Sequence, residues 1–168
     1  NKLKISTNIC SSPIGSHDFP GKLFMAEVAK KEGCKAIFGG DGADEIFGGY
    51  STYSQIIKNF KVNNSEYSKF KNSIFNFKGI NKLKFKFDLE RNWKKCFKTY
   101  EFLKKDERNR QAMMLMDTSL QLSSVGLRGN DLMFMSHSVE PRSIFLRKEI
   151  ITFGLNLPLK YKINLSKN

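Results

Sequence analysis

The chain has 168 residues, 40% of them hydrophobic and 12% aromatic, and its 29 basic and 16 acidic side chains give a formal net charge of +13. This length and apolar content are enough for one folded domain with a core, and they exclude an intrinsically disordered chain. No apolar stretch reaches the ~18 residues of a membrane span. The lysines are spread along the sequence without a nucleic-acid motif, so an RNA-binding domain ranks third among our hypotheses, and nucleic acid is disfavoured as a partner.

The cysteines indicate the compartment. Cys10, Cys34 and Cys96 are far apart and lack metal-ligand spacing. With no apolar signal-peptide region at the start, this pattern favours reduced thiols in the cytoplasm. The alternative is an exported protein with one disulfide and one free thiol. The first residue, Asn1, is not Met, which suggests that the chain was cut from something longer.

The first segment has the order of an α/β protein. We divide the chain into residues 1–50, 51–110 and 111–168. The first of these is predicted as loop, helix, strand and loop. Apolar residues at helical spacing predict a helix over Lys22–Glu32, with Gly33 as the residue that ends it. The short apolar run Ala36–Phe38 is typical of a buried strand in a parallel sheet, and glycines follow it.

The other two segments differ in how clearly their sequences predict secondary structure. Residues 51–110 are rich in Lys, Asn and Phe and have no clean period, although Tyr53, Ile56, Ile57 and Phe60 could form one helix face. The stretch Phe70–Phe87 fits a helix or a strand equally well. The last segment is predicted to be helical over Met113–Leu122 and over Ile144–Leu157, where Pro158 ends the helix.

The stretch Gly39–Tyr50, GGDGADEIFGGY, is the most informative part of the sequence, and we call it the acidic loop. Glycines after a strand let the backbone approach a ligand, and the start of a following helix favours an anion. The carboxylates of Asp41, Asp44 and Glu45 would repel a bare phosphate, but Mg2+ would remove the conflict by binding both. The residues therefore suggest a metal–polyphosphate site. A surface turn or a calcium loop is the alternative, although the spacing does not fit an EF-hand.

Three stretches resemble one family. The acidic loop is similar to the asparagine synthetase signature S-G-(D/E)-G-x-D-E-x-(F/L)-x-G-Y, with Gly39 in place of the serine. Asp131–Arg142 resembles the family's D-R-x-S-M-A-x-x-(L/V)-E-x-R run, and Leu157–Lys162 resembles its LP-x-KYK sequence. The resemblance is to the synthetase domain of glutamine-dependent asparagine synthetases. It implies that residues 1–168 form a partial, predominantly helical α/β domain of the adenine-nucleotide alpha-hydrolase type, with a short parallel sheet.

The resemblance also implies a reaction and residues for it. The family activates a carboxylate with ATP, releases pyrophosphate from an acyl-adenylate, and lets ammonia from glutamine displace AMP to form an amide. On that template Asp44 would hold Mg2+ against the pyrophosphate, and Asp41 would take a proton from the ammonia nucleophile. Gly40 and Gly42 would bring the backbone close to the nucleotide.

Four further residues have a predicted role. Glu45 is a weak site candidate that we prefer to read as a carboxylate in the first turn of a helix, stabilised by the helix dipole. Arg128 is a weak candidate for a phosphate contact, one residue away from the family's basic position. Glu140 and Arg142 are expected to form a buried structural ion pair that fixes the last helices.

Departures from the family limit the predicted activity. The pyrophosphate-binding S-G-G-x-D-S loop and the glutaminase domain with its N-terminal cysteine are absent from this sequence, and Arg142–Arg147 lacks the Pro and Asp of the family's R-x-P-F-L-D. We therefore expect a fragment, or one part of a split gene, whose partners are those missing pieces and a small carboxylate substrate such as aspartate. The second hypothesis is a catalytically inactive nucleotide-binding or interaction module on the same scaffold.

Overall fold

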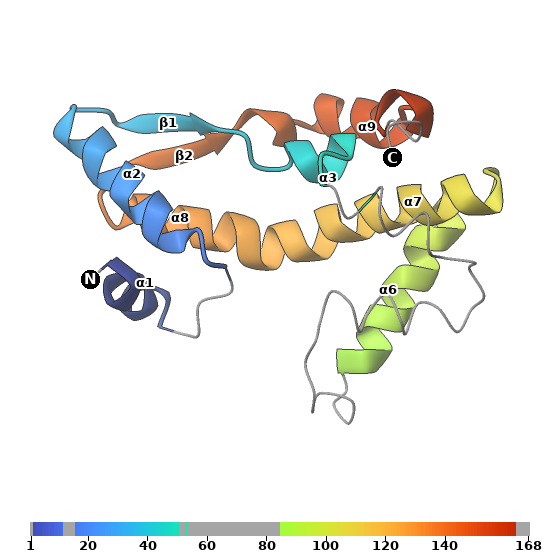
Figure 1. The fold of residues 1–168 in the computed structure, drawn as a ribbon, viewed down its shortest axis with the longest axis horizontal. Coiled ribbons are helices and arrows are strands. Elements are labelled where there is room, and N and C mark those ends of the chain that lie inside the picture. Colours follow the sequence, from blue (N-terminus) through green and yellow to red (C-terminus); the bar gives the residue numbers. More distant parts are fainter. Residues whose placement is uncertain (1, 12–15, 51–52, 54–84, 164–168) are drawn as a thin grey trace. The chain divides into compact units, whose positions relative to one another are not determined.

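The structure, a computed structural model, describes residues 2–11, 16–50, 53 and 85–163 (Figure 1). In chain order its elements are α1 (Lys2–Cys10), α2 (Phe19–Lys31), β1 (Ala36–Gly39), α3 (Ala43–Phe47), α6 (Phe85–Thr99), α7 (Lys105–Met116), a π-helix (Asp117–Leu127), α8 (Arg128–Met135), β2 (Glu140–Ser143), a 3-10 helix (Ile144–Leu146), α9 (Lys148–Asn156) and a second 3-10 helix (Leu159–Tyr161). Within the described residues the chain is therefore a predominantly helical α/β protein with a short parallel sheet, which confirms the predicted fold class.

The chain divides into two compact units. Unit 1 comprises residues 1–43 and 118–152, and unit 2 comprises residues 44–117 and 153–168. The helix face predicted around Tyr53 lies, apart from Tyr53 itself, outside the described residues. So does most of Phe70–Phe87, the stretch that fitted helix or strand equally well, but its last residues belong to α6.

Unit 1 is built on the two-stranded sheet. β1 and β2 pair in parallel with Ala36 opposite Glu140 and Gly39 opposite Ser143, and α2 and α8 pack against each other (Figure 1). Ile37 packs on a buried cluster from α2, α8 and the residue before β2, which consists of Ala26, Ala29, Phe134 and Val139.

The expected strand is present, but the expectation that it is buried was wrong. The side chain of Phe38 is 72% exposed. Side chains alternate along a strand, so the residue after Ile37 points to the opposite face of the sheet. The prediction of helices in residues 111–168 also missed β2. A strand of four residues that contains Pro141 is too short to show the alternating pattern of a strand.

The start of the chain is helical, whereas a loop was expected there. In α1, Ser6 and Thr7 donate hydrogen bonds from their hydroxyls to the carbonyls of Lys2 and Leu3, at 2.8 and 2.9 Å. These bonds pair the hydroxyls within the helix, and α1 packs against α2 with Ser6 and Cys10 buried. The predicted end of α2 is confirmed, since Gly33 follows it with φ +75° and donates its N–H to the carbonyl of Lys30.

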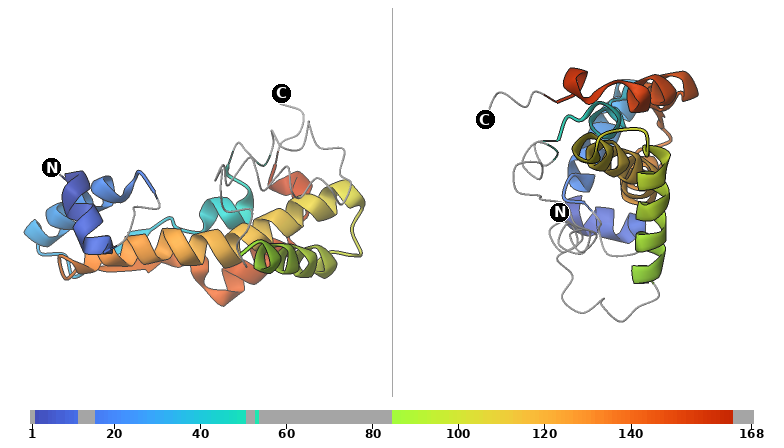
Figure 2. Two further views of the ribbon diagram at one scale, coloured as in Figure 1. Left: turned by 90° about the horizontal axis from the view of Figure 1, so that it is seen from below. Right: turned by 90° about the vertical axis from the view of Figure 1, so that its right-hand side faces the viewer.

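Unit 2 is organised around α7, which packs against α6 (Figure 2) and buries the apolar residues Ala112, Met113, Met114 and Met116. Gln111, 2% exposed, donates its amide to the carbonyl of Leu157 at 2.9 Å and accepts from Lys162 Nζ at 2.8 Å. Burial lowers the pKa of Lys162 to about 8. Hydrogen bonds to Gln111 thus connect the stretch that resembles LP-x-KYK to α7. The helix α9 ends before Pro158, as expected.

None of the helices in the described part of the chain combines the length and the apolar character that a membrane crossing requires.

The contact between Gly129 and Phe19 gives a test of the packing in unit 1. A Cβ at position 129 would overlap the ring of Phe19, which is 4% exposed and held in a buried cluster with Leu23 and Met133. We expect Gly129→Ala to lower the free energy of unfolding by about 1–3 kcal/mol in urea titrations. The control is Gly21→Ala in α2, where an added Cβ meets no atom within 4 Å, so its stability should stay equal or rise by up to ~1 kcal/mol. Equal losses in both variants would contradict this packing.

Candidate functional site

The acidic loop begins at the carboxyl end of β1, as predicted. The N–H of Ala43 donates to the carbonyl of Gly40 at 3.1 Å, and α3 follows directly. Gly42 is buried with φ +90°, and a Cβ there would overlap Leu146, so this position requires glycine. Gly40, by contrast, is exposed and has no atom within 4 Å of an added Cβ. Of the two glycines predicted to approach a nucleotide, Gly40 is therefore the open one.

The boundary between the two units falls inside the acidic loop, between Ala43 and Asp44, so each half is described within its own unit. In unit 1 the carboxylate of Asp41 is surrounded by donors from three elements. Its Oδ2 accepts hydrogen bonds from Asn130 Nδ2 of α8 at 2.8 Å and from Ser143 Oγ of β2 at 3.3 Å. Its Oδ1 lies 3.5 Å from Lys22 Nζ of α2, and the Asp41 side chain is only 17% exposed.

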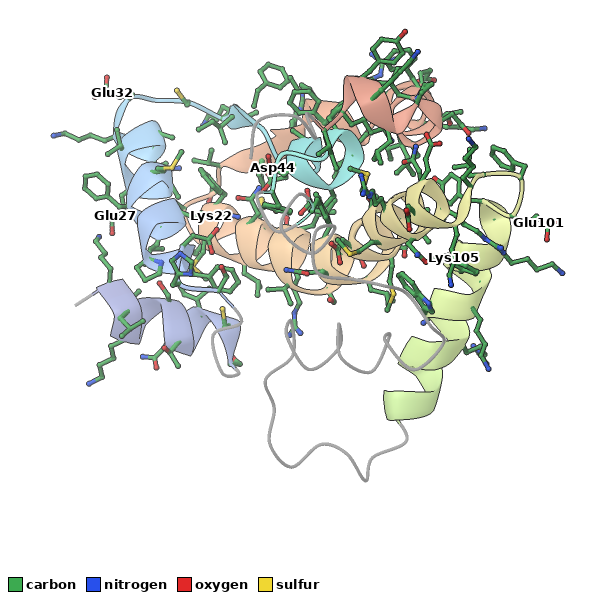
Figure 3. The ribbon with its side chains drawn as sticks, turned by 45° about the vertical axis from the view of Figure 1, so that its right-hand side comes forward. Lys22, Glu27, Glu32, Asp44, Glu101 and Lys105 are labelled. Atoms are coloured by element: carbon green, nitrogen blue, oxygen red, sulfur yellow. The ribbon has the colours of Figure 1, made fainter. Side chains whose placement is uncertain are left out.

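Lys22 also pairs with the residue that precedes α2. Its Nζ lies 3.2 Å from Oδ2 of Asp18, one helical turn away. Burial would raise the pKa of Asp18, but hydrogen bonding from Ser16 and the charge of Lys22 outweigh it and hold that pKa below its usual value. Among the described residues, Asp18 Oδ1 is buried without a hydrogen-bond partner. Lys22 is thus the cation shared by two carboxylates (Figure 3 shows its side chain on α2).

In unit 2, Asp44 is exposed on α3 (Figure 3). Its backbone carbonyl accepts the N–H groups of Gly48 and Gly49 at 2.8 and 3.0 Å, and its carboxylate lies so close to Gly49 that a Cβ there would clash with it. Within the described parts of the chain, that carboxylate makes no ion pair and no hydrogen bond. Asp44 is therefore a candidate carboxylate for a ligand.

Two carboxylates of unit 2, the buried Glu45 and the half-buried Asp117, each accept a tyrosine hydroxyl. Tyr50 donates to Glu45 Oε1 and Tyr53 donates to Asp117 Oδ2, both at 2.7 Å, and the two rings are 5.6 Å apart. Glu45 lies in the first turn of α3, as predicted, but it is 5% exposed and bound to Tyr50 rather than facing solvent. Burial raises the pKa of Asp117 to about 6; the bond from Tyr53 opposes this shift and the charge of Glu45 adds to it.

The residues present fit Mg2+ only together with a phosphate ligand. Among the described residues, no group of three or more His, Cys, Asp or Glu side chains could hold a metal ion. Mg2+ is commonly bound by one or two carboxylates, with phosphates and waters completing its octahedron. An exposed Asp44 beside a glycine turn suits this type of site and does not suit a cage made of protein ligands alone.

The predicted pair of Glu140 and Arg142 exists, but it is not buried. Arg142 Nη2 lies 3.0 Å from Glu140 Oε2, and the two side chains are 58% and 57% exposed. Both residues belong to β2 and are two positions apart, so their side chains leave the same face of a two-stranded sheet. The expectation of a buried pair that fixes the last helices was therefore wrong. Arg128 is exposed at the start of α8, and its phosphate contact stays a prediction.

Several residues of the site were missed by the sequence analysis. They are Lys22, Asn130, Ser143, Tyr53 and Asp117. Two of them gave a signal. Lys22 follows Asp18 at the i,i+4 spacing of a helical ion pair, and Asp117 interrupts an apolar run, which marks a buried polar group. Asn130 and Ser143 have no local signal, because only the tertiary fold brings them to Asp41.

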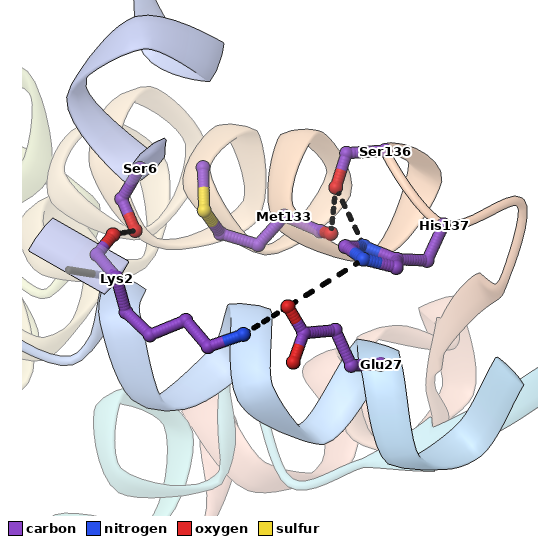
Figure 4. A network of polar contacts seen from close by, with 6 residues as sticks. All are labelled: Lys2, Ser6, Glu27, Met133, Ser136 and His137. Atoms are coloured by element: carbon purple, nitrogen blue, oxygen red, sulfur yellow. Dashed lines mark hydrogen bonds and ion pairs between the residues drawn. The ribbon is translucent and has the colours of Figure 1, made fainter. Parts of the chain in front are cut away.

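A second polar network joins α1, α2 and the end of α8 in unit 1 (Figure 4). Glu27 Oε1 pairs with Lys2 Nζ and lies 3.9 Å from His137 Nε2, while His137 Nδ1 is 2.9 Å from Ser136 Oγ. The order Ser, His, Glu is that of a hydrolase triad. However, the single hydroxyl proton of Ser136 is donated to the carbonyl of Met133 at 2.7 Å, so the hydroxyl can only accept from His137. This network fastens helices and is not a nucleophile site.

The comparison with known proteins agrees with the motifs. The profile of the family described as asparagine synthase matches residues 3–168. The chain belongs to the asparagine synthase family. This family member is 26% identical over 143 residues to a Methanocaldococcus jannaschii protein provisionally named asparagine synthetase (glutamine-hydrolyzing) 1. The match covers 85% of the chain but only 18% of that relative. No solved structure matches the chain significantly.

The half-buried Asp117 predicts a pH dependence of stability. Its pKa of about 6 in the folded chain is above the ordinary value of 3.8, so its contribution to stability is complete below pH 3.8 and is lost as the pH rises through 6. We expect the free energy of unfolding to fall by about 2–3 kcal/mol between pH 4 and pH 7 for this reason. In Asp117→Asn the amide oxygen can still accept from Tyr53, and urea titrations across this range should lose that part of the slope.

The control for this test is Asp131→Asn, which removes an exposed carboxylate from α8. It should keep the slope of the wild type. A slope that is unchanged in Asp117→Asn would show that Asp117 is ionised in the folded chain at pH 4.

Proposed function

We propose that this chain forms part of an ATP-dependent asparagine synthetase-like amidotransferase, which adenylates a carboxylate and lets ammonia displace AMP to give an amide. The supporting observation is the acidic loop itself. It follows the carboxyl end of a parallel strand, which is where α/β proteins bind ligands, and it presents an open Gly40 and an exposed Asp44.

In this proposal Asp44 is the carboxylate that holds Mg2+ and, through it, the phosphates of ATP. When bound, the metal would neutralise phosphate charge and so favour the departure of pyrophosphate. The chain's own residues fix the position of this carboxylate. The N–H groups of Gly48 and Gly49 hold the backbone of Asp44, and the bond from Tyr50 to the neighbouring Glu45 ties down α3. Glu45 then supports Asp44 and is not itself a ligand.

The role of Asp41 as the base that takes a proton from ammonia stays a prediction from the family motif. Its Oδ2 already accepts hydrogen bonds from Asn130 and Ser143. Only Oδ1, which faces Lys22, could therefore receive a proton from a substrate. A base role at Asp41 would therefore use Oδ1, beside the ammonium of Lys22.

The complete reaction needs more than these residues. The chain covers 18% of the length of its M. jannaschii relative. We propose that a glutaminase domain, which releases ammonia, and an S-G-G-x-D-S loop, which binds pyrophosphate, are supplied by polypeptide outside this sequence. The substrate would be aspartate or a similar small carboxylate, and the compartment the cytoplasm. Without that loop, the isolated chain should bind nucleotide and should not release pyrophosphate from ATP, aspartate and ammonia.

The alternative is a nucleotide-binding or interaction module of the same family that lacks catalysis. Arg147 favours it, because the family's R-x-P-F-L-D has an aspartate at this position and the charge is inverted here. The two functions differ in one experiment. Addition of the S-G-G-x-D-S segment of a related synthetase should restore pyrophosphate release if the chain is part of an enzyme, and should restore nothing if it is a binding module.

Nucleotide binding is tested by titration calorimetry with ATP in the presence and absence of Mg2+. We expect Mg2+-dependent binding that weakens at least tenfold, or about 1.4 kcal/mol, in Asp44→Asn. Asp131→Asn, which also removes one exposed carboxylate, should bind as the wild type does. Equal affinities with and without Mg2+, or an Asp44→Asn variant that binds normally, would contradict the proposal. RNA binding with a steep salt dependence that is unaffected by Asp44→Asn would favour an RNA-binding domain instead.

A further inference from the structure

We infer that Lys22 is a built-in counter-ion that holds Asp41 in the fold, so that the acidic loop offers Asp44, and not Asp41, to a divalent cation. Lys22 is in this sense a positioning residue. The hold of Lys22 on Asp41 is inferred from contacts within unit 1. Binding of the cation by Asp44 rests on the proposed function.

The contacts of Asp41 leave little room for another ligand. Oδ2 accepts from Asn130 and Ser143, and Oδ1 faces Lys22 Nζ at 3.5 Å. Asn130 is itself buried, with 6% exposure, and so cannot turn to solvent at low cost. Oδ2 therefore accepts two hydrogen bonds, and Oδ1 has an ammonium beside it.

The Lys22–Asp41 pair is also protected from solvent. Its side chains are 18% and 17% exposed, the lowest pair of values among the ion pairs of the described residues. The pair Glu140–Arg142 is 58% and 57% exposed, and the pair Arg147–Glu149 is 74% exposed on both sides. Solvent screens exposed charges more than partly buried ones, so the Lys22–Asp41 pair is screened less than those exposed pairs.

The same ammonium opposes a metal ion at this position. A divalent cation bound to Asp41 Oδ1 would lie close to a second positive charge that Asp18 and Asp41 already share. Asp44 has no such competitor, since among the described residues its carboxylate makes no ion pair. Lys22 thereby disfavours a divalent cation at Asp41 and leaves Asp44 as the carboxylate that would bind it.

The experiment measures binding of Mn2+ alone, without nucleotide, by electron paramagnetic resonance of the free ion. Lys22→Met keeps the apolar stem and removes the charge, so Asp18 and Asp41 are left without their cation. We expect Mn2+ to bind at least fivefold more tightly than to the wild type. Lys22→Arg should keep the wild-type affinity because it restores the charge. The matched control is Lys30→Met, which makes the same substitution at an exposed position of the same helix and should change the affinity less than twofold.

A second variant keeps the inference testable if Lys22→Met folds poorly. Adding Asp41→Asn to Lys22→Met removes the carboxylate that lost its counter-ion. The double variant should be more stable in urea than Lys22→Met and should lose the gain in Mn2+ affinity. A double variant that is no more stable, or a folded Lys22→Met variant whose Mn2+ affinity is unchanged or lower, would overturn the inference.

These outcomes are separable from those of the proposed function. A gain of Mn2+ affinity in Lys22→Met, together with no Mg2+-dependent ATP binding by the wild type, would support the role of Lys22 and reject the nucleotide site. Normal ATP binding through Asp44 with no Mn2+ effect at Lys22 would do the reverse.

Discussion

The carboxylate of Asp41 is the point on which the arrangement of unit 1 depends. Its two hydrogen bonds join residues that are 89 and 102 positions apart in the chain, and its ion pair adds α2. A parallel pair of strands needs such a distant partner, because its connection must cross over and cannot be a tight turn. The pairing of β1 with β2 and the ring of donors around Asp41 are therefore consequences of one tertiary arrangement.

Local patterns in the sequence were sufficient where local forces decide the structure. Helical periodicity and Gly33 located α2 and its end, and the apolar run before the glycines located β1. They failed where a distant partner decides. The four residues of β2 include Pro141 and two charged side chains, so nothing in them predicts a strand until β1 lies alongside. The burial expected for Glu140 and Arg142 failed with it, because the described sheet has only two strands and leaves them exposed.

The candidate site shows the same limit. The order of glycines and carboxylates after an apolar run located the acidic loop, since the two together suit a cation bound with phosphate. The neighbours of those carboxylates come from elements far along the chain, and a single sequence does not specify which polar residues will meet. Asp117 could have been recognised, because a carboxylate inside an apolar helical run needs a buried donor, and Tyr53 supplies it. Asn130 and Ser143 could not.

The three carboxylates of the acidic loop have three different environments, and this difference is a physical argument for where a ligand can bind. Asp41 pairs with the ammonium of Lys22, which also pairs with Asp18. Glu45 is buried and accepts the hydroxyl of Tyr50. Asp44 is left exposed, with no partner for its carboxylate within the described residues. Asp44 is therefore the carboxylate of the loop that remains for an external cation, and one carboxylate leaves most of the coordination shell of Mg2+ to other oxygens. The phosphates of a nucleotide can supply those oxygens. The arrangement of carboxylates in the loop therefore favours a metal–nucleotide complex over a free metal ion.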